Sequence, residues 1–431
     1  MKNGLFGLRR PAIVGAASAA LLLGTSPAAL QAQEVSGELI ILQWLGGTEA
    51  ELWADLQAAF MEANPGVTVR ELVVTGVGDM RGAMRTALLG GETVDIIINT
   101  WPAFRAELAD AGIIQPIDDA WTENDWSTQL SDSWRTLGAI GDDTYGLTYT
   151  YGNRSGIWYK TEHLENAGIE PPQTWDALIA SFDTLKAAGH EAPFAVPAQF
   201  WAHSELFETL LIRTSGVETA TALAAHDIPW TDPAVRAALE KYAELLAAGC
   251  CASASTMLAS DWDAEADQLF LADNRNYLLI GMWMNTRARN DYGLSEGEDY
   301  SMFQFPALGL GHDDTSMVDS KELNLTTNGN NPEAAIAFFD FMLSAEASEI
   351  QAGYGFASPS SEADTSLLGP VQQISTAAVA ESQVQFVLGD LLPGDLVDEY
   401  RVQLQRFLQD PSDAMIDSVL EAIEAKAQVS Y

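Results

Sequence analysis

The sequence contains few of the residues on which most enzyme and metal sites depend. Only two cysteines and five histidines occur among 431 residues, and they show no spacing typical of a zinc site. The G-x-S-x-G, H-E-x-x-H and P-loop lysine motifs are also absent. We therefore predict no metal site and no cofactor. A pair of carboxylates of the glycosidase type stays open, because 61 acidic residues always offer some pair.

Basic side chains are scarce as well. The 21 lysines and arginines face 61 acids, which gives a formal net charge of −40. The acids are scattered along the chain, so the charge belongs to the whole surface. Such a surface repels nucleic acid and anionic membranes, and we expect neither as a partner. It suits a salty environment, where counterions screen the self-repulsion; an ordinary exported protein of low pI is the alternative.

Long apolar runs are lacking except near the N-terminus. Lys2, Arg9 and Arg10 precede an apolar run at 12–23, and small residues follow it. This pattern predicts a secretory signal peptide over residues 1–32, and the run is too short to span a membrane. No cysteine follows it closely, so we expect a periplasmic protein without a lipid anchor. General export is favoured, although the arginine pair also suits twin-arginine export.

The two cysteines, Cys250 and Cys251, are neighbours in the chain. An exported protein meets an oxidising compartment, but adjacent residues do not easily reach ordinary disulfide geometry. The sequence leaves two alternatives open, a vicinal disulfide and two free thiols at a helix end.

The rest of the chain alternates between strand-like and helix-like patterns. Such alternation favours an α/β fold with parallel, doubly wound sheets. Strands are expected at 38–43, 67–73, 95–99, 146–150 and 277–282, and helices at 49–64, 79–89, 104–111, 204–214, 233–248, 263–272, 332–343 and from 412 onward.

The segment 157–178 carries the densest local signals. It reads as a short strand and then a helix that ends at Gly168. Pro171 and Pro172 form a rigid turn, and Thr174 stands where an N-cap would begin the next helix.

Several motifs follow one another in an order that resembles a known family. They are FMEANPGVTV (60–69), GGETVD (90–95), YGLTY (145–149), the segment 157–178, GMW (281–283) and NNPEAA (330–335). The chain resembles the bacterial extracellular solute-binding proteins of family 1, which serve ABC sugar importers, and above all the members that bind glucose and related small sugars. It departs from their pattern at Val94 and Thr148, where proline is usual, and at Met282, where aspartate is usual.

The resemblance implies a two-lobed periplasmic-binding-protein fold of the α/β class, in which each lobe is a sheet flanked by helices. Three crossings would join the lobes, with the ligand cleft between them. We expect the first lobe at 33–147 plus about 308–362, and the second at 148–307 plus about 363–431.

The function implied is that of a monomeric receptor that catalyses nothing. It would bind a mono- or disaccharide between the hinged lobes and deliver this ligand to the transmembrane subunits of an ABC permease. Two alternatives remain. One is a binding protein for a polyol or a glycosylated compatible solute, and the other is a secreted carbohydrate-active enzyme that uses paired carboxylates.

A sugar site needs aromatic platforms for C–H faces and fixed polar groups for hydroxyls. Trp44 and Trp101 follow expected strands, Trp283 follows the strand at 277–282, and Trp201 lies in a loop before a helix. Ligands of open α/β sheets bind beyond the carboxyl ends of the strands. We therefore predict that these four tryptophans face the ligand; packing in the core is the alternative.

Polar ligand contacts are predicted at further positions. They are Glu49, Arg81, Asn153, Arg154, His203, Asn285, Arg287, Lys321 and Tyr354. Lys321 falls near a lobe crossing where relatives carry aspartate, so it would reorient hydroxyls or select an acidic sugar. Glu49 has a second explanation, because it also favours a helix N-terminus, and Arg81 and His203 would equally suit a surface.

Overall fold

The computed structural model describes residues 35–76 and 80–431. The expected signal peptide at 1–32 lies outside the described residues. Residues from Val35 to the C-terminus form one compact unit. None of the helices in its described part is long and apolar enough to cross a membrane.

A six-stranded sheet organises the first lobe. Its strands are β1 (Gly37–Gln43), β2 (Val67–Val73), β3 (Ile96–Asn99), β6 (Gly146–Asn153), β11 (Thr315–Leu325) and β12 (Gln383–Phe386), in the order β12-β11-β3-β1-β2 with β6 paired to β11. The first three strands are parallel to one another. β11 is antiparallel to both β3 and β6.

Helices cover both faces of this sheet. The reason can be seen in β1, which has apolar side chains on both of its faces. Its side chains alternate between the faces. Leu39 and Ile41 enter a core with α1 (Thr48–Ala63) and α13 (Pro332–Met342). Ile40 and Leu42 enter the opposite core with α2 (Arg81–Leu89) and α3 (Pro102–Asp110). A strand that is apolar on both faces has to be buried on both.

A four-stranded sheet organises the second lobe. Its order is β10 (Tyr300–Gln304), β7 (Gly156–Lys160), β9 (Tyr277–Leu279) and β8 (Phe194–Ala195). The helices around it are α6 (Thr161–Ala167), α7 (Trp175–Ala187), α8 (His203–Ala224), α9 (Pro233–Ala247), α10 (Ala254–Ala259), α11 (Trp262–Phe270), α12 (Trp283–Asn290), α17 (Gly394–Gln409) and α18 (Asp413–Ser430).

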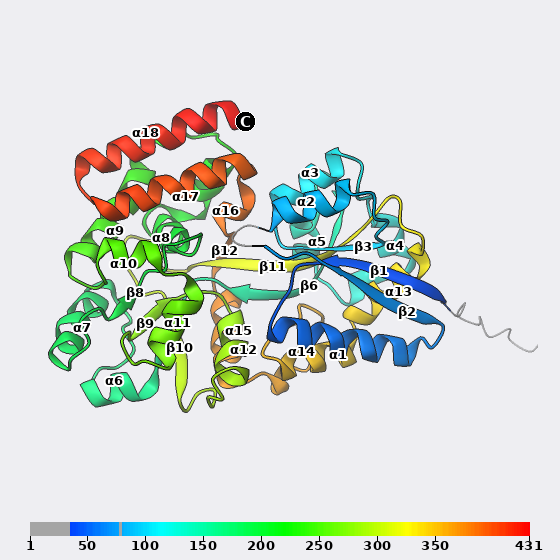
Figure 1. Cartoon of the computed structure of the whole chain (residues 1–431), viewed down its shortest axis with the longest axis horizontal. Coiled ribbons are helices and arrows are strands. Elements are labelled where there is room, and N and C mark those ends of the chain that lie inside the picture. The colour runs from blue at the N-terminus through cyan, green and yellow to red at the C-terminus, as the bar shows by residue number, and fades with distance from the viewer. Residues whose placement is uncertain (1–34, 77–79) are drawn as a thin grey trace, which may run out of the picture. The chain divides into compact units, whose positions relative to one another are not determined.

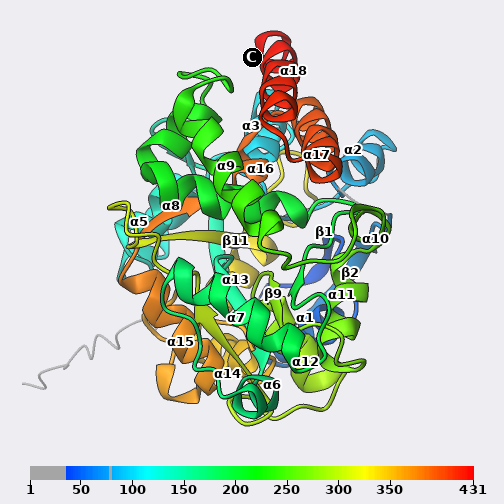
Figure 2. The ribbon, with the colours of Figure 1, turned by 90° about the vertical axis from the view of Figure 1, so that its left-hand side faces the viewer.

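Shorter elements complete the described chain. They are α4 (Asp118–Glu123), α5 (Asp132–Leu137), β4 (Ala139–Ile140), β5 (Asp143–Thr144), α14 (Ala345–Gly353), α15 (Pro370–Ala380) and α16 (Leu388–Leu391), with 3-10 turns at Trp126–Thr128 and Thr365–Leu367. Figure 1 shows the paired β6 and β11 running from the first lobe toward the helices of the second. In Figure 2 the helices of the second lobe stand in front of β11.

The expectation of parallel, doubly wound sheets is wrong for much of the fold. β7 is antiparallel to both β10 and β9, and β11 enters the first sheet antiparallel to β3. Strand–helix alternation indicates how neighbours along the chain connect. It does not indicate which distant strand completes a sheet, and more than 200 residues separate β3 from β11.

Most of the expected elements are confirmed, with shifted ends. Gly168 ends α6 at φ 67°, and the Thr174 hydroxyl accepts a hydrogen bond from the Ala177 N–H at 3.3 Å as the N-cap of α7. β9 ends at Leu279 instead of residue 282. α8 continues to Ala224, with a break at Gly216 instead of an end near 214.

Cys250 and Cys251 form a vicinal disulfide, which decides between the two alternatives left by the sequence. Cys250 is fully buried and belongs to the core that α7, α8 and α9 share. The disulfide lies just beyond the end of α9.

Candidate functional site

A cleft with a volume of about 350 Å³ opens between the two lobes. Its lining comes from the turns after β1 and β3, the β6–β7 connection, the first turns of α8, α11 and α12, strand β11 and the segment 387–401. Seven of the predicted residues line it, namely Trp44, Glu49, Trp101, Arg154, Trp201, Trp283 and Lys321. The structure thus brings them together, and their contact with a ligand stays a prediction.

The first lobe contributes a pair of tryptophans to the cleft. β1 and β3 are adjacent and parallel, so the residues that follow them emerge at the same edge of the sheet. Trp44 and Trp101 stand there with ring centroids 4.6 Å apart and an interplanar angle of 34°. The Arg81 guanidinium lies 5.9 Å from the Trp101 ring. Both tryptophans thus line the cleft at the edge where the strand ends placed them, and their contact with a ligand stays a prediction.

The second lobe contributes three tryptophans in a row. The Trp283 ring lies 5.8 Å from Trp201 and 5.9 Å from Trp262, nearly edge to face with both. The Arg154 guanidinium stacks on this row, 4.4 Å from the Trp283 ring and 5.5 Å from Trp201. Trp262 is a cleft residue that the sequence analysis missed, because no motif shows that α11 packs beside α12.

Three ion pairs hold five of the charged side chains of the cleft. Arg154 pairs with Glu205 and, at 3.1 Å, with Asp319, and all three side chains are about nine-tenths buried or more. The Lys321 ammonium lies 2.7 Å from the Glu49 carboxylate. Asp319 was missed, although it stands two residues before Lys321 on the same face of β11.

Asp390 is a further cleft carboxyl that no sequence signal indicated. It is 6% exposed, and burial raises its pKa to about 7 although Arg154 and Arg81 lie near enough to oppose the change. Behind it the buried Glu208 accepts hydrogen bonds from the Leu388 N–H at 2.7 Å and the Tyr400 hydroxyl at 3.0 Å. Burial also raises the pKa of Glu208. Arg401 completes this side of the cleft.

Four predicted residues are buried and engaged in the framework instead of lining the cleft. Asn153 donates to Gln304 at 2.8 Å, and Asn285 accepts from the Tyr300 hydroxyl at 2.6 Å. His203 pairs with the Arg401 carbonyl at 3.0 Å, and burial lowers its pKa to about 4. Arg81 stacks near Trp101 and borders a different groove, between α2, α3 and α17. Asn285 turns inward because helix α12, not a continued strand, follows Met282.

Arg287 lines a second space, which we call the outer groove. Its volume is about 290 Å³. Its lining residues are Gly46, Gly47, Thr48, Glu49, Trp262, Asp263, Trp283, Thr286, Arg287 and Asp291. Tyr354 belongs to neither set of described lining residues; its hydroxyl donates to Asp55 at 2.6 Å.

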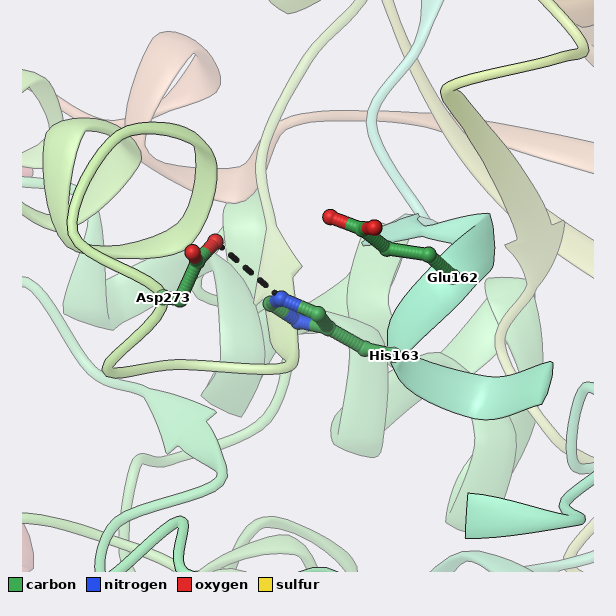
Figure 3. Close-up of side chains that lie close together, drawn as sticks. All are labelled: Glu162, His163 and Asp273. Atoms are coloured by element: carbon green, nitrogen blue, oxygen red, sulfur yellow. Dashed lines mark hydrogen bonds and ion pairs between the residues drawn. The ribbon is translucent and has the colours of Figure 1, made fainter. Parts of the chain in front are cut away.

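Away from the cleft, one cluster in the described part of the chain has the spacing of metal ligands. It consists of Glu162, His163 and Asp273. Figure 3 shows the Asp273 carboxylate facing the His163 ring, with Nε2 and Oδ1 3.1 Å apart. The Lys160 ammonium lies 2.7 Å from Asp273 and 2.9 Å from Glu162. Because both carboxylates already pair with this ammonium, we assign no metal to the cluster.

Comparison with known proteins agrees with this architecture. Residues 46–349 match the model of the bacterial extracellular solute-binding protein family. The chain belongs to this family. The solute-binding protein is 26% identical over 379 residues to the α-glucosides-binding periplasmic protein of Rhizobium meliloti, which covers 82% of this chain and 79% of that one.

A second relative is the osmoprotective compounds-binding protein of Synechocystis, 25% identical over 213 residues. The match covers 48% of this chain, which spans about half the length of that relative. A match over about half of each chain does not identify the ligand of the solute-binding protein.

Solved structures share the two-lobed fold. A bacterial solute receptor described as having an exclusive preference for β-D-galactopyranose superposes with a TM-score of 0.80 at 19% identity, over 91% of this chain and 99% of that chain. A chitin oligosaccharide binding protein also gives 0.80, at 18% identity over 92% and 99%. These likenesses confirm the predicted fold class.

Proposed function

We propose that this solute-binding protein is the periplasmic receptor of an ABC importer and that it binds a neutral mono- or disaccharide in the cleft. The observation that carries the proposal is the pair of aromatic walls, Trp44 with Trp101 on one lobe and Trp201, Trp262 and Trp283 on the other. Indole faces suit the C–H faces of a sugar ring, and the charged pairs between the walls suit its hydroxyls.

The charges of the cleft favour a neutral ligand. Lys321 is paired with Glu49, and Arg154 is paired with both Glu205 and Asp319. A sugar acid would have to compete with these carboxylates for its cation. Of the two roles considered for Lys321, orientation of hydroxyls is therefore favoured over selection of an acidic sugar.

A ligand that touches both walls would hold the two lobes together. For the lobes we keep the bounds 33–147 with about 308–362 and 148–307 with about 363–431. With these bounds β6 crosses from the first lobe to the second, and β12 belongs to the second lobe although it pairs with β11. Such a ligand stabilises the closed state through contacts that the open state does not offer. The closed receptor, acting as a monomer, then docks on the permease subunits and releases the sugar. No catalytic step is needed for this role.

A thermal-shift panel tests the proposal. A ligand present at 100 times its Kd stabilises the folded state by roughly 2.7 kcal/mol, so at least one neutral sugar should raise the Tm by several degrees. Glucuronate and galacturonate match glucose and galactose in ring shape but carry a carboxylate, and as controls they should leave the Tm unchanged. A rise with the acids alone would contradict the neutral-ligand assignment.

A polyol or a glycosylated compatible solute is the second candidate ligand. The osmoprotective compounds-binding relative and the acidic composition favour it. Sorbitol and glucosylglycerol therefore belong in the same panel, and a Tm rise with these alone would replace the sugar.

The enzyme alternative has its own test. Glu205 and Asp319 are paired with one guanidinium, that of Arg154, so both carboxylates are already held by a cation. We expect labelled oligosaccharides to be retained stoichiometrically and recovered intact after incubation. Hydrolysed product would instead favour a carbohydrate-active enzyme.

A further inference from the structure

The outer groove is a continuation of the cleft. The two spaces share Gly46, Glu49, Trp262 and Trp283 as lining residues. Each space alone lies at the lower end of the range of roughly 300–1,000 Å³ typical of small-ligand pockets, and the two joined lie well inside it. A ligand that fills only the cleft would leave the part of Trp262 and Trp283 that lines the outer groove without a ligand contact.

The first-lobe wall of the outer groove combines two glycines, Gly46 and Gly47, with the side chains of Thr48 and Glu49. A Cβ atom built on Gly46 or Gly47 would meet nothing within 4 Å. The β1–α1 turn therefore presents no side chain at these two positions, in a groove that Trp262 and Trp283 also line. Missing side chains leave room for a flat ring to approach the backbone closely.

The second-lobe wall is held by contacts within the protein itself. The Arg287 guanidinium lies 5.2 Å from the Trp262 ring. Arg287 is itself held by Asp267 at 3.0 Å and by the Tyr292 hydroxyl at 2.7 Å. An aromatic platform braced in this way has already lost its side-chain entropy, so contact with a ligand costs less.

Glu49 stands at the junction of the two spaces. It lines both, and its ion pair with Lys321 holds it in place at 2.7 Å. A carboxylate accepts several hydrogen bonds at once. It therefore has capacity left for hydroxyls of two adjoining sugar rings, one on each side of a glycosidic bond.

We propose that the physiological ligand is a neutral saccharide of at least two rings, with one ring in the cleft and the next in the outer groove against Trp262. This inference rests on the carbohydrate-binding function proposed above. It favours a disaccharide or a longer chain over a monosaccharide as the ligand. It also assigns Trp262 and the β1–α1 turn at Gly46 and Gly47 to a second sugar-binding subsite.

Calorimetric titration with matched pairs tests the inference. The probes are glucose with maltose, glucose with trehalose, galactose with lactose, and N-acetylglucosamine with diacetylchitobiose. For the pair that the protein recognises, we expect the disaccharide to bind at least tenfold more tightly than the monosaccharide. Equal affinity of the two members would overturn the second subsite while leaving carbohydrate binding intact. Failure of every sugar to bind would remove the proposed function itself and this inference with it.

Two tryptophan variants separate the subsites. Trp262→Ala removes a ring that lines both spaces, and Trp44→Ala removes one that lines the cleft alone. We expect Trp262→Ala to lower the disaccharide-to-monosaccharide affinity ratio at least fivefold. Trp44→Ala should weaken both ligands by the same factor, so that the ratio stays within twofold of the wild type.

A third, conservative variant tests whether any loss seen in Trp262→Ala comes from a folding defect instead of the missing aromatic ring. Trp262→Phe keeps an aromatic face on α11, and we expect it to retain most of the affinity ratio. The Tm of each variant without ligand is measured in parallel. An identical loss of ratio in the Trp44 and Trp262 variants, both folded, would overturn the assignment of Trp262 to a separate subsite.

Discussion

At the scale of single residues, Trp283 has the most contacts that matter for binding. Its ring meets Trp201, Trp262 and the Arg154 guanidinium, and it lines both the cleft and the outer groove. We expect Trp283→Ala to weaken sugar binding at least tenfold, because contact residues of this kind dominate binding free energy.

The measurement is a calorimetric titration with the best ligand of the panel. Trp134→Ala is the matched control, since Trp134 is a partly buried tryptophan that packs on Tyr151 and does not belong to the described lining of the cleft or the outer groove. An unchanged affinity in a folded Trp283→Ala variant would remove Trp283 from the site.

We expect Asp390 to make the stability of the protein depend on pH. Burial, together with the nearby Glu208, disfavours the ionised carboxylate and outweighs Arg154, Arg81 and Arg401, so that the pKa rises to about 7. The unfolded chain releases this proton near pH 4. The carboxyl therefore favours folding below pH 4, and this contribution is lost as the pH rises to 7 and beyond.

Asp390→Asn should consequently raise the Tm by several degrees at pH 8 and leave it nearly unchanged at pH 4.5. Scanning calorimetry of both proteins across this range measures the difference. A gain in Tm that is the same at every pH would show that the ionisation of Asp390 is not its cause.

The sequence was sufficient to place residues whose position depends on a nearby strand end. Trp44 and Trp101 were placed at the edge of the sheet because they follow strands, and the end of a strand is a local property; their role in binding stays a prediction. Glu205, Asp319 and Asp390 were not located, because their role depends on Arg154 and on elements far away in sequence. Asn153 and Asn285 were predicted to contact the ligand, but they are buried and hydrogen-bonded to Gln304 and Tyr300. A polar residue close to a site in the sequence can also stabilise the structure behind that site.

At the scale of secondary structure, β11 is a strand of the first sheet that local sequence patterns did not predict. It pairs with β3, β6 and β12 and carries Asp319 and Lys321 into the cleft. Its sequence, TSMVDSKELNL, places charges where an apolar run would mark a central strand. Functional sites are where such local rules are broken, and for this reason β11 was not expected from the sequence.

Helix α8 depends on its internal glycine. Gly216 has φ 85°, and a Cβ there would come within 2.9 Å of the His312 ring. We expect Gly216→Ala to reduce the free energy of unfolding by at least about 1 kcal/mol, because left-handed backbone and a clash act together. Urea denaturation measures this loss.

Gly82→Ala in α2 is the control for that change. Gly82 lies inside a helix with no heavy atom near its Cβ position. Alanine there should be neutral or stabilising by up to about 1 kcal/mol. Equal effects of the two substitutions would mean that the break in α8 is not specific to glycine.

At the scale of the whole molecule, charge is the dominant property. A formal net charge of −40 destabilises a compact state through self-repulsion, and salt screens that repulsion. We expect the Tm to rise by several degrees between 0.05 and 2 M KCl, as followed by circular dichroism. Sucrose at matched osmolality is the control, and an equal rise in sucrose would point away from charge screening.

The arrangement of tryptophans has one practical consequence. Five of the twelve line the cleft, and an arginine stacks on two of them. We expect a sugar that enters this space to displace water from these indoles and to change their emission. The intrinsic fluorescence of the unlabelled protein should therefore change on binding, and a transport assay could read receptor occupancy from the receptor itself.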